Sequence, residues 1–218
     1  MSDKNSPNND RGQAYTLEGF VSAMVVLMAV LFALQSVVIT PTSGGLSDRS
    51  VQAQIQQEAQ DALVVSDQEG NLNLSNTIRK WDATDDSGDK EQFYKASVPG
   101  PDGKTTYNTT EFANQSQLGS ILEQRFANNG YSYNVELIYE NESEFNTTYL
   151  VYQGAPSPDA VTASYVVTLY KEDTLTVDED DGITLPAAHG DHNHNYPIPE
   201  TTNTDLVYNV VEVRVIVW

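Results

Sequence analysis

The chain has no cysteine among its 218 residues. This excludes a disulfide framework, a metal site with thiolate ligands and a cysteine nucleophile. A domain that folds outside a cell must then be stabilised by its hydrophobic core, by charge adapted to salt, or by neighbouring subunits.

Positive charge is scarce. Lysine and arginine total 11 against 31 aspartate and glutamate residues, so the formal net charge is −20. Without a basic patch to neutralise phosphates, no nucleic acid is predicted as a partner. Scattered acidic residues are typical of proteins adapted to high salt, which screens their repulsion. The alternative is a function in binding cations or a basic partner.

Sequence motifs of enzymes are also missing. The chain contains no G-x-S-x-G, P-loop or dinucleotide-binding glycine pattern. Pairs of carboxylates carry no information in a chain this acidic. We therefore predict a protein that is not an enzyme and has no cofactor.

The histidines form one cluster with an aspartate, made of His189, Asp191, His192 and His194. Imidazole and carboxylate groups are ligands of zinc, copper or nickel, so the cluster is a candidate metal site. No glutamate base lies nearby, and a polar loop gives its ligands little support. Adventitious binding, or none, is the favoured interpretation over a structural or catalytic metal.

The longest apolar run extends from Phe20 to Ile39 without a charged residue. A helix of about 20 residues spans roughly 30 Å, the thickness of the hydrocarbon core of a bilayer. We predict a leader at 1–12, a transmembrane helix at 13–40 and a domain at 41–218. Lys4 and Arg11 precede the helix and only Arg49 follows it closely, which favours a cytoplasmic N-terminus and a domain outside the cell.

Directly before the apolar run stand Arg11, Gly12 and Gln13, and Glu18 lies at its edge. With the following Tyr15–Phe20, this pattern resembles the class III signal peptide of archaeal type IV pilins and archaellins. Segments 167–170 and 208–218 resemble an uncharacterised haloarchaeal family of pilin-like membrane proteins.

The resemblance implies that a prepilin peptidase cuts after Gly12 and that the helix is retained in the membrane or in a filament. Glu18 would then pair with the new amine of Gln13, although it lies one residue further from the cut than the glutamate of bacterial pilins. In the alternative interpretation Glu18 lies at the membrane interface and has no role.

A second helix is predicted from Asp48 to about Val65, because apolar residues recur there at helical spacing. They are Val51, Ile55, Ala59, Ala62 and Val65. We expect this stripe to pack on the sheet that follows, and packing on neighbouring subunits is the alternative. A third helix is predicted over 116–128, ended by Gly130.

Alternating β-branched and aromatic residues predict strands at 131–140, 148–153, 160–170 and 207–218. The last strand has an apolar odd face and a half-solvated even face with Glu212 and Arg214, and it is expected to be paired. The predicted fold class is α+β: a long N-terminal transmembrane helix, then helices and a small antiparallel sheet, as in pilins.

Between the last two strands lies an insertion, 171–205, with an acidic run at 178–181 and all the histidines. A loop of this length is expected to be either functional or disordered. Five Asn-x-Ser/Thr sequons are candidate glycosylation sites. They are Asn73, Asn108, Asn114, Asn141 and Asn146.

The sequence therefore predicts a single-pass membrane protein, pilin-like and part of a type IV pilus-like or secretion-like surface assembly. Its expected partners are the lipid bilayer, other pilin-like subunits or an assembly platform, and a prepilin peptidase. The alternative is an anchored extracytoplasmic binding or envelope protein whose N-terminus stays uncut.

Overall fold

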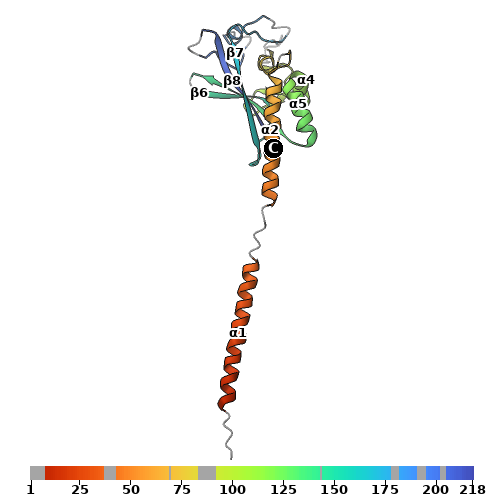
Figure 1. The fold of residues 1–218 in the computed structure, drawn as a ribbon. Coiled ribbons are helices and arrows are strands. Elements are labelled where there is room, and N and C mark those ends of the chain that lie inside the picture. Colours follow the sequence, from red (N-terminus) through yellow and green to blue (C-terminus); the bar gives the residue numbers. More distant parts are fainter. Residues whose placement is uncertain are drawn as a thin grey trace, which may run out of the picture. The chain divides into compact units, whose positions relative to one another are not determined.

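A computed structural model describes residues 8–36, 43–68, 70–82, 92–142, 144–177, 182–190, 195–201 and 205–218. The chain divides into two compact units, Met1–Asp48 and Arg49–Trp218 (Figure 1). Each unit is described by itself.

The first unit contains helix α1, Asn8–Ser36. Its Tyr15–Phe32 window has a mean hydropathy of 1.9, and no part of it is buried. By length and composition this helix is a candidate membrane anchor or signal sequence. The helix includes Arg11, Gly12 and Gln13, and it therefore begins within the stretch predicted as a leader.

The second unit is built on a four-stranded antiparallel sheet with the order β6-β5-β8-β7. Its strands are β5 (Tyr133–Asn141), β6 (Glu144–Val151), β7 (Val161–Tyr170) and β8 (Val207–Val217). The last strand lies between β5 and β7, and Val215 is paired with both Val135 and Ala163. The α+β class and the pairing of the final strand are thus confirmed.

Alternation along β8 separates the two faces of the sheet, as predicted. Val211, Val213 and Val215 are buried against the core, whereas Glu212 and Arg214 are half-buried on the other face. We call this second face the outer face.

Helix α2, Ser43–Ser66, packs on the domain with a face slightly rotated from the predicted one. Ala59 and Ala62 are buried together with Leu63, but Val51 and Val65 are 47% and 43% exposed. Including these two valines in the buried stripe was wrong. The helix is rotated so that Leu63, and not these valines, faces the hydrophobic core.

Two glutamines of α2 lie against the edge of the sheet. Gln56 and Gln60 donate hydrogen bonds from Nε2 to the carbonyl oxygens of Thr162 and Ser164 in β7, at 3.0 and 3.2 Å. Edge strands present unpaired backbone groups, and these amides satisfy two of them. Helix α2 therefore packs on the domain through Ala59 and Ala62 of the predicted stripe and through these two glutamines.

The helix predicted over 116–128 is in fact the second of two, and the first was missed. Helix α4 (Thr109–Gln115) ends at Ser116, which has extended backbone and caps α5 (Gln117–Arg125). The break lets the two helices pack closely, since a Cβ at Gly119 would lie 2.2 Å from the Phe112 carbonyl oxygen. A short 3₁₀ turn (Ala127–Asn129) follows, and Gly130 ends it at φ 84°, as predicted.

The remaining elements are short. They are α3 (Leu74–Ile78), the pair β1 (Trp81–Asp82) and β2 (Gln92–Phe93), the pair β3 (Val98–Pro99) and β4 (Thr105–Thr106), and α6 (Leu185–Gly190).

The described parts of the insertion 171–205 belong to the core. Leu175, Leu185, Tyr196 and Ile198 are fully buried in the same cluster as the sheet. Disorder, one of the two expectations for this loop, was wrong for these parts, because apolar residues spaced along the insertion supply buried surface.

Aromatic rings connect the insertion to the rest of the core. Trp81 makes edge contacts with Phe93 and Tyr196, with ring centroids 5.2 and 6.2 Å apart. Tyr196 in turn lies 6.4 Å from Tyr208 of β8. The insertion is thereby packed between the first short strands and the last long one.

Candidate functional site

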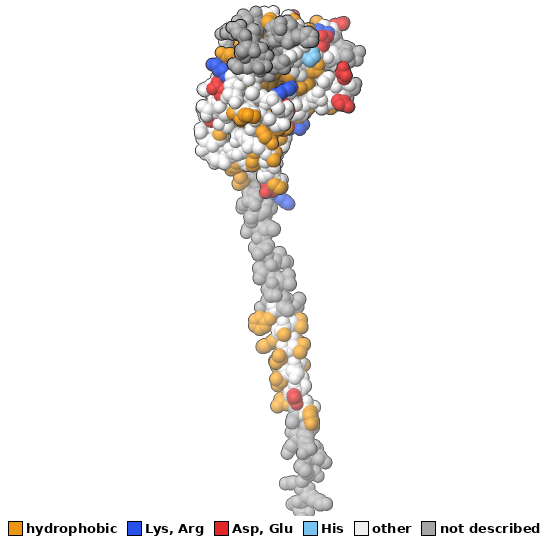
Figure 2. All heavy atoms as spheres, turned by 180° about the vertical axis from the view of Figure 1, so that it is seen from behind, with side chains coloured by type: hydrophobic (Ala, Val, Ile, Leu, Met, Phe, Trp, Pro, Cys, Tyr) orange, Lys and Arg blue, Asp and Glu red, His pale blue; other side chains and the backbone are white. Residues whose placement is uncertain are grey.

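The surface of α1 is the largest exposed apolar feature of the described residues. Every side chain from Tyr15 to Phe32 is exposed, including Phe20 at 64% and Phe32 at 70%. Figure 2 shows hydrophobic side chains all along this part of the helix. Apolar area in water is unfavourable by about 25 cal/mol per Å², so this surface is suited to a bilayer or to other helices.

The predicted processing and assembly residues lie on the same helix. Arg11, Gly12 and Gln13 have helical backbone. Glu18 is an exposed carboxylate near the start of the apolar window, and Gly19 beside it has no atom of another element within 4 Å of its Cβ position. The structure therefore brings the four predicted residues onto one helical segment.

The outer face of the sheet carries a hollow of about 240 Å³. We call it the outer-face hollow, and it is lined by Ile138, Glu140, Phe145, Val166, Thr201, Asn209, Val210 and Glu212. Phe145 is 78% exposed and Val166 is 58% exposed. Apolar side chains beside carboxylates make this a candidate contact surface, which the sequence did not predict. The one indication of this surface in the sequence was Phe145, an aromatic residue between polar neighbours.

A charged cluster lies beside the hollow. Arg214 Nη2 is 3.1 Å from Glu212 Oε1, and Arg214 Nη1 is 3.8 Å from Glu136 Oε2. Burial raises the pKa of Glu136, while Arg214 opposes this shift and Glu212 adds to it. Because the arginine is already paired, the cluster stabilises the sheet surface and does not offer a free cation.

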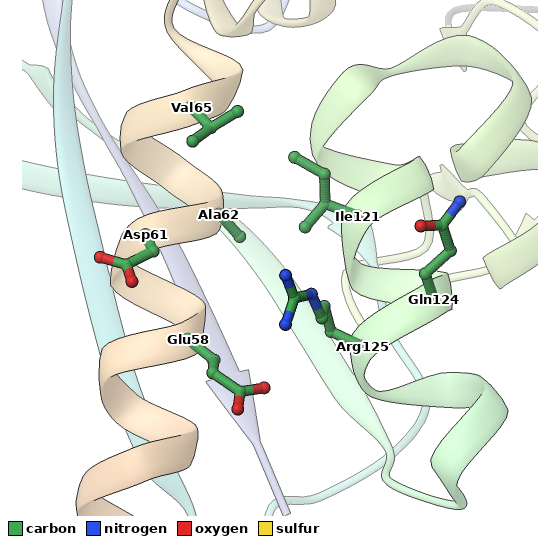
Figure 3. A pocket seen from close by; sticks show the side chains of 7 residues that line it. All are labelled: Glu58, Asp61, Ala62, Val65, Ile121, Gln124 and Arg125. Carbon is green, nitrogen blue, oxygen red and sulfur yellow. The ribbon is translucent and has the colours of Figure 1, made fainter.

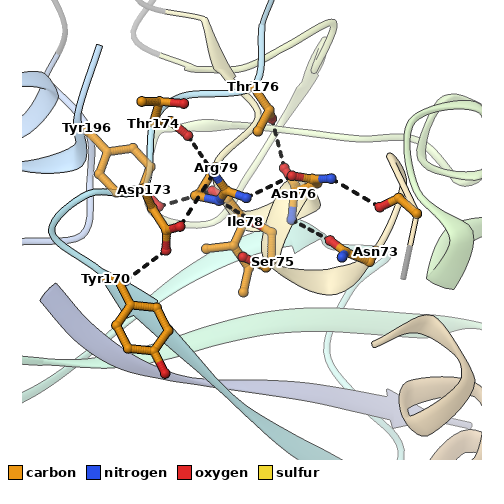
Figure 4. Close-up of polar contacts among 11 residues, drawn as sticks. Asn73, Ser75, Asn76, Ile78, Arg79, Tyr170, Asp173, Thr174, Thr176 and Tyr196 are labelled. Atoms are coloured by element: carbon orange, nitrogen blue, oxygen red, sulfur yellow. Dashed lines mark hydrogen bonds and ion pairs between the residues drawn. The ribbon is translucent and has the colours of Figure 1, made fainter. Parts of the chain in front are cut away.

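A second cluster attaches the insertion to α3 (Figure 4). Arg79 donates to the Thr174 carbonyl and to Asn76 Oδ1, both at 2.8 Å, and it lies 3.9 Å from Asp173. Tyr196 donates to the Ile78 carbonyl oxygen. These bonds use the guanidinium for backbone and amide acceptors, so its role is to hold the insertion in place.

A groove of about 270 Å³ separates α2 from α5 (Figure 3). Val65 and Ile121 point toward one another across it, and Arg125 extends from α5 toward the side of α2 that carries Glu58. The polar side chains of the groove are Glu58 and Asp61 on α2 and Gln124 and Arg125 on α5.

Only one member of the predicted metal cluster belongs to the described residues. His189 is exposed, and its Nδ1 lies 2.7 Å from the Tyr196 carbonyl oxygen, which fixes the proton on Nδ1. Asp191, His192 and His194 lie outside the described residues, as does the acidic run 178–181. Across the residues that are described, no group of three or more His, Asp or Glu could hold a metal ion.

The sequon asparagines occupy different environments. Asn108 and Asn73 cap helices α4 and α3, and Asn114 lies within α4. Asn141 and Asn146 lie on β5 and β6. Asn108, Asn114 and Asn146 are exposed, and the other two are half-buried.

These features define an α+β domain that follows an exposed apolar helix in sequence. The chain belongs to DUF7288, a family of unknown function, which it matches over residues 11–217. No curated protein and no solved structure matches it.

Proposed function

We propose that the protein is a pilin-like, membrane-anchored subunit of a surface assembly and acts by helix packing and not by catalysis. The observation that carries this proposal is the apolar helix α1, whose described side chains are exposed on every side. A helix that is apolar all round needs an environment of lipid or of other helices.

The residues before the apolar window of α1, Arg11, Gly12 and Gln13, support processing by a prepilin peptidase. Cleavage after Gly12 would leave Gln13 as the new N-terminus, with a free amine near Glu18. A carboxylate near the bilayer costs less when it has a cationic partner, so this pairing would stabilise Glu18 within an assembly. The domain Arg49–Trp218 would lie outside the membrane.

Small residues on α1 favour close approach between copies. Ala23 and Ala29 are exposed, and Gly19 has open space around it. Side chains of this size let membrane helices pack backbone to backbone, while the larger aliphatic residues fill the bundle.

The first test is the intact mass of the protein recovered from its native membrane. We expect a chain beginning at Gln13, and a full-length chain for Gly12→Val. Gly19→Val is the matched control, because it makes the same substitution in the same helix beyond the cleavage point and should still be cut. A wild-type chain beginning at Met1 or Ser2 would contradict processing.

Assembly is tested by disulfide cross-linking. Because the chain has no cysteine, only the introduced residue can form the cross-link. Ala29→Cys should form disulfide-linked dimers in the membrane under mild oxidation, whereas exposed Ser157→Cys in the domain should form far fewer. Equal, low yields for both would argue against packing through α1.

The outer-face hollow supports a second candidate function, that of an anchored binding or envelope protein with an uncut N-terminus. Phe145, Val166 and Val210 expose apolar surface there beside Glu140. An uncut wild-type chain that stays monomeric in the cross-linking assay, together with loss of a native complex in Phe145→Ser, would favour this candidate.

A further inference from the structure

The fold exposes the described residues of the sequons to different degrees. Transfer of a glycan needs access both to the asparagine amide nitrogen and to the hydroxyl two residues later, because both define the sequon. The structure describes both groups for four of the five sequons, since Ser143 of the Asn141 sequon lies outside the described residues.

Asn108 meets both requirements. It is exposed and has extended backbone, with φ −75° and ψ 165°. Its Oδ1 accepts a hydrogen bond from the Glu111 backbone N–H at 2.7 Å. Within the described part of the chain, its Nδ2 has no hydrogen-bond partner. Thr110, which carries the sequon hydroxyl, is also exposed.

The Asn114 sequon is closed at its hydroxyl, although Asn114 itself is exposed. Ser116 is 0% exposed, and its Oγ accepts hydrogen bonds from Thr77 Oγ1 and from the Gly119 backbone N–H. Reaching that hydroxyl would break the cap of α5 and the contact between α4 and α5.

The Asn146 sequon is closed at its hydroxyl, and the Asn73 sequon is half-buried both at its asparagine and at Ser75. Thr148, the hydroxyl residue for Asn146, is buried and lies 3.2 Å from the hydroxyl of Tyr139. Asn73 is half-buried, and the residue that follows it, Leu74, belongs to the core.

We propose that, of the four sequons that the structure describes in full, Asn108 is the one that is N-glycosylated in the folded protein. Its substrate partner would be an oligosaccharide activated as a lipid-linked phosphate ester. In the transfer, the bond from Nδ2 to the sugar C1 forms and the bond from C1 to the phosphate oxygen breaks. The lipid phosphate leaves, and one Nδ2 proton passes to a base of the transferase. This proposal rests on the outward orientation of the domain in the proposed function.

Modification at this position is compatible with the fold. A glycosylated asparagine keeps its Oδ1, so it still accepts the N–H of Glu111 and still caps α4. The buried residues of this helix, Phe112 and Gln115, are not part of the sequon.

The test is intact mass and peptide mapping of the full chain from its native membrane. Asn108→Asp removes the acceptor but keeps a good helix cap, so it should lose one glycan mass without loss of stability. Thr110→Ala should lose the same mass and Thr110→Ser should retain it. Asn114→Asp is the matched control on the same helix and should change the mass only by the substitution itself.

Two results would overturn the proposal: an unmodified Asn108 peptide in the wild-type protein, or a glycan that disappears with Asn114→Asp. Ser157→Cys separates this failure from failure of the proposed function. If a membrane-impermeant maleimide labels this cysteine on intact cells and Asn108 is bare, the glycan proposal alone fails. If labelling requires opened cells, the proposed topology fails with it.

Discussion

Helix α1 and the domain Arg49–Trp218 use the same apolar residue types in opposite ways. Leu63 in the domain is 0% exposed, whereas Leu31 of α1 is 49% exposed. The hydrophobic effect acts equally on both, because it depends on the area removed from water. The difference shows that the domain covers its own apolar residues, whereas the apolar surface of α1 stays uncovered within its own unit.

The largest expected effect is the loss of domain stability when Gly119 is substituted, and Gly19 is its comparison in α1. In Gly119→Ala the new Cβ would meet the Phe112 backbone at 2.2 Å, whereas at Gly19 it would meet nothing within 4 Å. We expect Gly119→Ala to destabilise the domain by about 5 kcal/mol or more, because backbone must move, and Gly19→Ala to leave it unchanged. Denaturant unfolding of the full chain in detergent, followed by near-UV circular dichroism, measures both. A stable Gly119→Ala domain would show that α4 and α5 are further apart than described.

Substitution of one leucine in each unit tests the comparison between α1 and the domain directly. Leu63→Ala should lower the free energy of unfolding of the domain by about 2–5 kcal/mol, because it leaves a cavity. Leu31→Ala should not change that unfolding, but it should weaken retention in the membrane fraction. The same denaturation assay and a carbonate extraction separate the two readouts. Destabilisation of the domain by Leu31→Ala would mean that α1 packs on it.

A smaller effect is expected at the edge of the sheet. Gln60→Ala removes the donor to the Ser164 carbonyl oxygen, 3.2 Å away, and should cost about 1 kcal/mol. Gln57→Ala, an exposed glutamine on the same helix, is the control and should cost less than about 0.5 kcal/mol. Hydrogen exchange should increase near β7 in the first variant only, and equal exchange in both would mean that water replaces the amide.

The smallest effect concerns Glu136, a partly buried charge on the outer face. Because burial raises its pKa in the folded state, the fold binds a proton more readily than the unfolded chain does. Stability attributable to this group is therefore lost as the pH rises from the ordinary glutamate range through the raised pKa. Glu136→Gln should be slightly more stable than the wild type at neutral pH. Its free energy of unfolding should also vary less with pH between the ordinary glutamate range and the raised pKa.

Thermal unfolding between pH 4 and pH 7 measures the pH dependence of stability in Glu136→Gln. Glu140→Gln, at an exposed position, is the control. An unchanged pH dependence in Glu136→Gln would show that the pairing with Arg214 cancels the effect of burial on the pKa of Glu136.

The sequence predicted the elements whose period is regular. Alternation in 131–140 and 207–218 predicted β5 and β8 with the correct buried faces, and the charge-free run predicted α1. It failed where tertiary packing decides the outcome. The break at Ser116 depends on the close contact of Gly119 with Phe112, and the insertion is held by Arg79 and Tyr196, which are distant in sequence.

The candidate sites differ in how far the sequence reveals them. The roles of Gly12 and Glu18 stay predictions, which depend on the position of these residues next to the apolar run in the sequence. The outer-face hollow was not predicted, because Phe145, Val166 and Val210 come from three strands and meet only through the register of the sheet.

The position of Trp81 gives the domain a built-in optical probe. The protein has two tryptophans, and Trp81 is buried between Phe93 and Tyr196. Its emission therefore reports the docking of the insertion on the first short strands, and it does so without a label. Release of the insertion would shift this emission to the red while the far-UV signal of the sheet stays constant.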